Sequence, residues 1–262
     1  MDHPETLRLM VFLSLFALFA ALEWLSPRRA ARLGRARWAT NGAIMVLGAV
    51  LLRLLALALP LLAIGAAVDA AGLGWGLFNQ LSWNPWVEGV LAVLILDLAL
   101  WTQHLVTHRV PFLWRFHRVH HADGDFDVTT AIRFHPLEIA ASMLVKIAVI
   151  YALGPAAVAV LVFEMLLNGT ALFNHANLAL PLWLDRALRL LLVTPDMHRV
   201  HHSVHRAEHD SNYGFCLSIW DQLFGTYRAQ PMDGHDGMTI GLEWQDDRPA
   251  WLGWSLLLPF RK

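Results

Sequence analysis

The chain has 262 residues, of which 56% are apolar, above the roughly 45–50% of a typical globular domain. We therefore expect an integral membrane protein. Twenty lysines and arginines against 21 aspartates and glutamates leave a net charge of −1, which gives no support for nucleic-acid binding. A single cysteine excludes an internal disulfide framework and any cysteine-rich zinc or iron–sulfur site.

Three apolar stretches are long enough to cross a hydrocarbon core, which needs about 20 residues. The first, residues 8–25, precedes a run of arginines, and positive charge marks the cytoplasmic side, so we expect an uncleaved span with its N-terminus outside. The second lies within residues 41–68 and includes Pro60 and Arg53, which either snorkels or faces the helix bundle. The third starts near Trp86 and carries His104 to the cytoplasmic surface. The arginine run comprises Arg28, Arg29, Arg32, Arg35 and Arg37.

A fourth apolar stretch, residues 137–172, is interrupted by the turn signal Gly154-Pro155. It predicts a helical hairpin whose two arms are short for separate membrane spans. Lys146 and Glu164 lie at nearly equal distances from the turn, one on each arm. We predict that they form an ion pair, because an unpaired charge in a membrane is costly; the alternative is that the two charges face different cavities.

Two short segments hold ten of the 14 histidines. In the first, His104 and His108 are spaced i, i+4, so on a helix both imidazoles project from one face, as ligands of one metal must. The pattern HxxHH follows at residues 117–121 and recurs at residues 198–202. Thr194 and Pro195, as cap and first helical residue, predict a helix that carries the second copy.

The pattern HxxxH, HxxHH, HxxHH supplies more imidazoles than one tetrahedral or octahedral ion can use, so we expect two metal ions. A solvated or pH-sensing histidine patch is the alternative. Leu105 stands where a zinc peptidase carries its glutamate, and the chain has none of the Glu-x-x-His pairs of soluble di-iron bundles. The possibility that remains is a site for two metal ions that has only nitrogen ligands and lies beside the apolar membrane segments.

These residues resemble the membrane fatty acid hydroxylase/sterol desaturase superfamily of non-haem di-iron oxygenases. The resemblance covers residues 97–227, about half the chain, and its combination of motifs is highly specific. The matching motifs are Asp97 seven residues before His104, His104-x3-His108, His117-x2-His120-His121, Asn174-His175-Ala-Asn177, His198-x2-His201-His202, Asp210-x-Asn212-Tyr213-Gly214 and Trp220-Asp221-x2-Phe224-Gly225-Thr226.

The resemblance implies an all-α integral membrane protein of about four membrane-embedded segments or hairpins, with a cytoplasmic histidine-rich helical cap that holds two metals. It assigns nine metal ligands: His104, His108, His117, His120, His121, His175, His198, His201 and His202. His135 is expected as a further ligand or a hydrogen-bonding neighbour. Asp97 is expected to orient an imidazole, and Asn174, Asn212 and Asp221 to support ligands or to fix turns. His205 and His209 lie outside the ligand pattern and are expected at the surface or beside the ligands.

The resemblance also implies an O2-dependent oxidoreductase that uses two iron ions to hydroxylate or desaturate a fatty acyl, sterol-like or related lipid. Zinc or another divalent metal can occupy such a site after purification. Electrons are expected from a separate ferredoxin- or cytochrome-type reductase system, and the chain, residues 1–262, is expected to form one domain in a bacterial inner membrane. The alternatives are a carotenoid or ether-lipid hydroxylase on the same scaffold, and a membrane protein that binds or moves a divalent metal without redox chemistry.

Overall fold

The computed structural model describes residues 4–58, 62–82 and 84–261, and within these ranges the chain forms helices and isolated bridges but no strand. Five helices are long and apolar enough to cross a membrane, which confirms the expected all-α membrane fold. They are α1 (Pro4–Leu25), α2 (Ala36–Ala58), α4 (Pro85–Arg109), α6 (Pro136–Leu153) and α7 (Ala157–His175). The shorter helices are α3 (Ala63–Leu73), α5 (Pro111–His121), α8 (Leu182–Leu188), α9 (Pro195–His201), α10 (Arg206–His209), α11 (Ile219–Leu223), α12 (Gly234–Gly237) and α13 (Leu252–Leu257).

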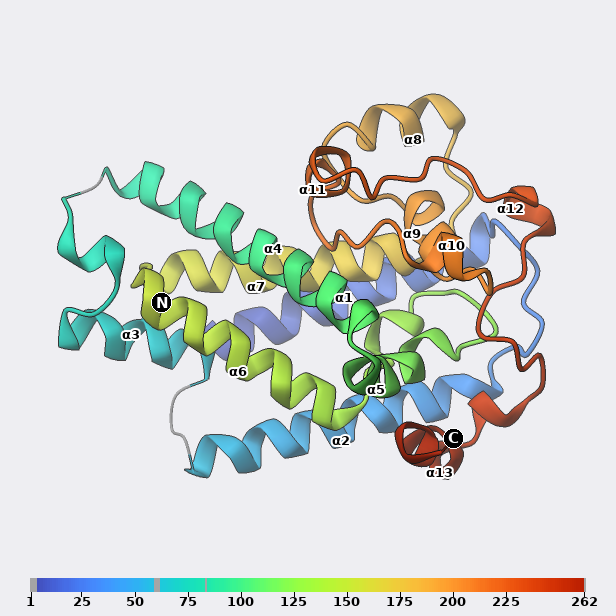
Figure 1. Ribbon diagram of the computed structural model, residues 1–262, viewed down its shortest axis with the longest axis horizontal. Coiled ribbons are helices and arrows are strands. Elements are labelled where there is room, and N and C mark those ends of the chain that lie inside the picture. The colour runs from blue at the N-terminus through green and yellow to red at the C-terminus, as the bar shows by residue number, and fades with distance from the viewer. Residues whose placement is uncertain (1–3, 59–61, 83, 262) are drawn as a thin grey trace.

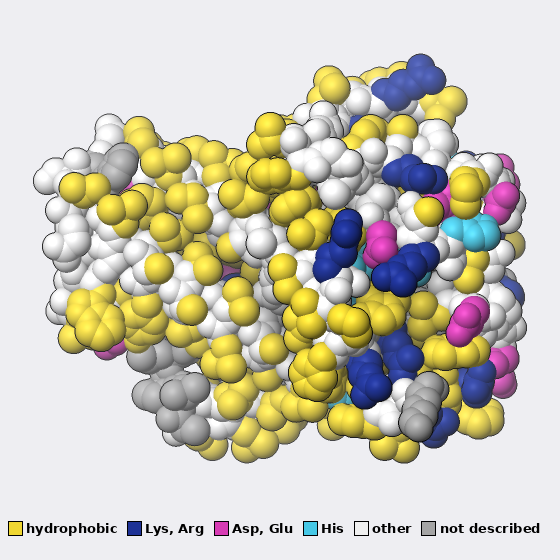
Figure 2. Space-filling model, viewed as in Figure 1, with side chains coloured by type: hydrophobic (Ala, Val, Ile, Leu, Met, Phe, Trp, Pro, Cys, Tyr) yellow, Lys and Arg dark blue, Asp and Glu magenta, His cyan; other side chains and the backbone are white. Residues whose placement is uncertain are grey.

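The long helices lie side by side, and most of the short ones gather in a cap at one end of them (Figure 1). The N-terminus of α1 lies at the opposite end, as does α3. Hydrophobic side chains dominate the visible surface of the long helices, whereas charged side chains gather over the cap (Figure 2). This division is the one expected when lipid surrounds the long helices and water surrounds the cap.

The predicted second span, residues 41–68, is divided in the structure. Its first part belongs to α2, which ends at Ala58, and its last part to α3; Pro60 lies outside the described residues. Three alanines of α3, at positions 63, 66 and 67, are buried against Leu96 and Val160. Because alanine side chains are small, they let α3 approach its neighbours closely, so this segment packs inside the bundle.

The predicted hairpin is present as α6 and α7, joined by a turn in which Gly154 has φ +64°. A Cβ on Gly154 would lie 2.4 Å from the carbonyl oxygen of Trp75, so only glycine fits this position. The arms have 18 and 19 residues, each sufficient by length to cross a membrane. The fourth predicted segment therefore accounts for two of the five long helices.

The predicted ion pair between the hairpin arms is confirmed. Lys146 Nζ lies 3.0 Å from Glu164 Oε1. Arg8 on α1 adds a second cation, with its Nη1 2.9 Å from Glu164 Oε2. Glu164 therefore ties three helices together through one buried carboxylate.

Replacing Lys146 by Met and Glu164 by Gln should destabilise the protein non-additively, because each single change breaks the same contact. A double-mutant cycle on thermal unfolding in detergent should give a coupling of roughly 0.5–3 kcal/mol. Additive effects of the two substitutions would contradict the pairing.

Candidate metal centre

Four helices and His202, the residue directly after α9, bring the nine predicted ligands to the cap end of the bundle. Pro111, the first residue of α5, prevents α4 from continuing, so the histidines on the two helices turn toward each other instead of lying along one axis. In α9 the predicted cap is present: Thr194 Oγ1 accepts a hydrogen bond from the Met197 N–H, with Pro195 as the first helical residue. His175 is the last residue of α7.

The nine histidines form two compact groups, in each of which one ring nitrogen per residue lies within 4.8 Å of those of the others. The first group contains His104, His108, His117, His121 and His201, and the second contains His120, His175, His198 and His202. Each HxxHH motif contributes to both groups. The i and i+4 residues of the motif at 117–121 enter the first group, and those of the motif at 198–202 enter the second. The i+3 residue of each motif belongs to the other group.

Hydrogen bonds at Nδ1 fix the tautomer of four of these rings. An Nδ1 that faces a carbonyl or carboxylate oxygen must carry the proton, which leaves a lone pair on Nε2. The contacts are His104 to the Tyr213 carbonyl at 2.7 Å, His175 to the Ala171 carbonyl at 2.8 Å, His201 to the Ser211 carbonyl at 2.7 Å and His117 to Glu138 Oε1 at 2.6 Å. Each of these four histidines belongs to one of the two groups, so its Nε2 lone pair is available to a metal ion there.

The lone pairs face one another at close range. His104 Nε2 lies 3.0 Å from His117 Nε2, although the Nδ1 contacts place the proton of both rings on the other nitrogen. In the second group, His175 Nε2 lies 3.1 Å from Nε2 of both His120 and His198. Two lone pairs at such distances repel each other unless a cation lies between or beside them. The donor set therefore fits two metal ions, one in each group.

Burial keeps the cap histidines neutral. The pKa values of five of them fall well below the ordinary value of 6.5, first because burial penalises the charged imidazolium and then because other histidines are close; these are His120, His121, His198, His201 and His202. A neutral imidazole is the form that binds a metal, so no proton must be displaced near pH 7.

The expectation that Asp97 orients an imidazole is wrong. Its carboxylate accepts hydrogen bonds from the Trp220 indole at 2.8 Å, from the Leu217 N–H at 3.2 Å and from the Cys216 N–H at 3.4 Å. Asp97 thus fastens the segment after the second HxxHH motif to α4. Asp221 fixes the same segment by accepting the Tyr213 and Gly214 N–H groups at 2.9 and 2.8 Å.

The side chains of Asn212 and Asn174 hold backbone segments in place and do not contact the ligand side chains. Asn212 has φ +52°, and its amide bonds to the Met197 carbonyl and to both backbone groups of Arg228. Asn174 donates to the Phe215 carbonyl at 2.9 Å. Together with Asp221, they hold the Ser211 and Tyr213 carbonyls against the histidine groups.

The remaining histidines of the pattern lie outside both groups. His135 caps α6 through the Leu137 N–H and contacts the Leu256 carbonyl, so it fills neither of its two expected roles as a ligand or a ligand's neighbour. His205 is exposed and lies 3.3 Å from Asp233. His209 stacks on Trp114, with its ring 6.0 Å from that of His108. The surface and ligand-neighbour positions expected for His205 and His209 are thus observed.

Sequence reasoning missed Glu138, whose carboxylate contacts His117. Its position in the first turn of α6, directly after the RFHP segment, was the available signal. A large cavity was also missed. It has a volume of about 660 Å³, within the range of roughly 300–1,000 Å³ common for ligand sites, and both His104 and His117 line it.

This cavity extends from the histidines into the membrane-spanning bundle. Its walls are mainly apolar and include Leu100, Met143 and Phe215. Lys146, which also lines it, lies eight residues along α6 from Glu138, which corresponds to about 12 Å of helix. Arg53 also lines the cavity, and its side chain is exposed.

The fold and the two histidine groups define a helical integral membrane protein that has a buried cluster of imidazole side chains at one end of its membrane spans. The Fatty acid hydroxylase family model matches residues 89–226, just over half the chain. The chain belongs to this family. The match nearly coincides with residues 97–227, where the motifs were recognised.

Three curated relatives illustrate the range of the family. The chain is 33% identical over 149 residues to the ornithine lipid hydroxylase OlsE of Rhizobium tropici, covering 57% of this chain and 44% of that protein. It is 34% identical over 159 residues to the alkylglycerol monooxygenase of Homo sapiens, covering 59% and 33%. It is 24% identical over 143 residues to the cholesterol 25-hydroxylase of Rattus norvegicus, covering 54% and 47%. The matched region spans less than half of each relative, and no solved structure matches the chain.

Replacing Glu138 by Ala should weaken metal binding about 10- to 100-fold, because His117 loses the carboxylate that fixes its ring and raises its basicity. Competition with a chromophoric chelator measures this affinity. Glu243→Ala, at an exposed residue, is the matched control and should bind metal as the wild type does. Equal affinities for the two variants would contradict the role of Glu138.

Proposed function

We propose that this protein is a membrane-bound di-iron oxygenase that modifies a lipid with O2 and electrons from a separate ferredoxin- or cytochrome-type reductase system. The observation that carries the proposal is the apolar cavity whose wall includes His104 and His117. In this proposal the cavity places a C–H bond of a lipid beside His104 and His117, two of the nine proposed ligands. The names of the relatives, which are hydroxylases and monooxygenases of lipids, support the same reaction class.

In this proposal the two histidine groups hold two irons, which supply O2 activation and one-electron chemistry when bound. His104, His108, His117, His121 and His201 hold one ion and His120, His175, His198 and His202 the other. The chain contributes positioning and exclusion of water. The ligands are all buried, and Phe134 stacks on His120 at 4.1 Å and shields it.

Of the two possible reactions, we propose hydroxylation in preference to desaturation. In hydroxylation, one O2, two electrons and two protons convert the C–H bond to an alcohol and release one water, which is the class of reaction in the names of the relatives. A fatty acyl or sterol-like lipid is the first substrate class. Similarity to the alkylglycerol monooxygenase favours an ether lipid as the second.

We further propose that residues 1–262 act as one domain in a bacterial inner membrane, with the cap in the cytoplasm and the N-terminus outside. The arginine-rich segment after α1 lies at the cap end, where the Arg28 N–H bonds to the Asn177 carbonyl. Positive charge beside membrane spans favours the cytoplasmic side. Non-redox metal transport is less favoured, because the nine histidines form two compact groups, and α5 and α9, which carry most of them, lie at one end of the bundle (Figure 1).

Lipid mass spectrometry of cells that produce the protein should reveal a species heavier by one oxygen atom, or lighter by two hydrogens if the reaction is desaturation. His201→Ala should abolish this species. Gly48→Leu should reduce it at least tenfold while metal content stays unchanged, because Gly48 lines the cavity and a leucine would fill it.

Gly42→Leu is the matched control for Gly48→Leu. Gly42 lies on the same helix, and a Cβ there meets no described atom within 4 Å. Lipid modification should persist in this variant. Unchanged lipids in wild-type cells, or full modification by His201→Ala, would contradict the proposed function.

A further inference from the structure

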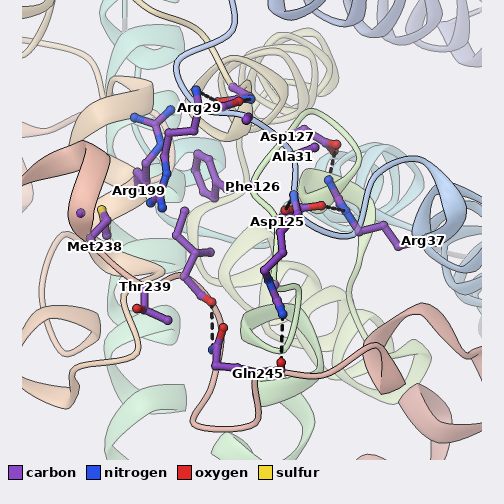
Figure 3. A pocket seen from close by; sticks show the side chains of 16 residues that line it. Arg29, Ala31, Arg37, Asp125, Phe126, Asp127, Arg199, Met238, Thr239 and Gln245 are labelled. Carbon is purple, nitrogen blue, oxygen red and sulfur yellow. Dashed lines mark hydrogen bonds and ion pairs between the residues drawn. The ribbon is translucent and has the colours of Figure 1, made fainter.

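A second cavity, of about 220 Å³, lies in the cap, between the arginine-rich segment after α1 and the chain after α5 (Figure 3). Its volume is below the range of roughly 300–1,000 Å³ typical of sites for drug-sized ligands, so it suits a small polar group. Arg29 and Arg199 line one side of it and Asp125 and Asp127 the other. The proposed oxygenase chemistry uses none of these residues.

The two carboxylates are already occupied by protein donors. Asp125 accepts the N–H groups of Arg32, Leu33 and Gly34 at 2.7–3.0 Å. Asp127 accepts from Arg37, from the Trp38 indole and from the N–H and hydroxyl of Thr129. The oxygens of both carboxylates therefore already accept hydrogen bonds from other donors of the protein.

Arg199 is fully buried and only partly satisfied. Its Nη1 pairs with Asp196, which also lies 3.5 Å from Arg28 Nε, so that carboxylate is shared by two arginines. No described residue accepts a hydrogen bond from Nε or Nη2 of Arg199, nor from the buried Nη1 of Arg29. Leaving such charged donors without acceptors in a buried place is costly.

The backbone of Arg29 is fixed in position. Asn177 accepts its N–H through Oδ1 at 3.1 Å and donates from Nδ2 to its carbonyl at 2.8 Å. Phe126 forms the floor between the arginines and the histidines, with Arg199 Cζ 5.2 Å from its ring and the His202 ring 5.0 Å away on centroids. The cavity is thus a preformed site with guanidinium donors next to the second histidine group.

We propose that Arg29 and Arg199 bind a phosphate group in this cavity. A phosphate offers the several anionic oxygens that two planar guanidinium groups recognise. The group can come from free phosphate or from the headgroup of a membrane lipid, since Arg29 lies four residues beyond the end of membrane-spanning α1.

The test titrates the full chain, in a phosphate-free non-ionic detergent at constant ionic strength, with inorganic phosphate and separately with dihexanoyl phosphatidylglycerol, by calorimetry. Saturable binding near one per chain is expected for at least one probe. Arg29→Gln should weaken it about tenfold, the loss that corresponds to one charge-assisted hydrogen bond. Arg199→Lys, which keeps the charge but loses the planar fork, should weaken it as well.

Arg35→Gln is the matched control, because Arg35 is exposed in the same segment and outside the cavity, and it should leave binding unchanged. Binding of inorganic phosphate identifies a free anion as the source, and binding of the lipid alone identifies a headgroup. Absence of binding by both probes overturns the proposal, as does binding that Arg29→Gln and Arg199→Lys do not weaken, or that Arg35→Gln weakens equally. None of these results depends on lipid oxidation.

Discussion

Repulsion between buried imidazole lone pairs is the constraint on which the rest of the structure depends. Rings such as His104 and His117 approach to 3.0 Å between their Nε2 atoms while each keeps its proton on Nδ1. A protein fold holds such contacts only if the surrounding backbone fixes every ring and a cation compensates the facing lone pairs. This geometry is held in place by the apolar spans, by the short cap helices and by the polar contacts around them.

Two aspartates transmit the rigidity of the spans to the cap. Asp97, on the membrane-spanning α4, anchors the segment at residues 216–220, and Asp221 within the adjacent helix α11 anchors residues 213 and 214. The Tyr213 carbonyl held in this way accepts the hydrogen bond from the His104 Nδ1–H group. A histidine on α4 is therefore oriented by a loop that α4 itself secures, which makes the arrangement self-consistent.

Sequence periodicity predicted which residues gather but not how they divide. The spacing of residues 117–121 and 198–202 indicated ligand-bearing helices, and all nine predicted histidines meet in the cap. The exchange of His120 and His201 between groups depends on how α5 and α9 cross, which spacing along one chain cannot encode. In the sequence, Arg37 belongs to a run of arginines that indicates membrane orientation, yet it is buried and pairs with Asp123, Asp125 and Asp127, about 90 residues away. Glu138 and the cavity beside it likewise arise only from tertiary packing.

The most direct measurement of the central claim is the iron content and Mössbauer spectrum of protein purified anaerobically. We expect about two irons per chain with the signature of a coupled pair in the wild type. We expect about one iron per chain, with that signature lost, in a His198→Ala/His202→Ala variant, because these residues belong to the second group alone. Full lipid-oxidising activity in protein essentially free of iron, or an iron content unchanged by the double substitution, would contradict the central claim.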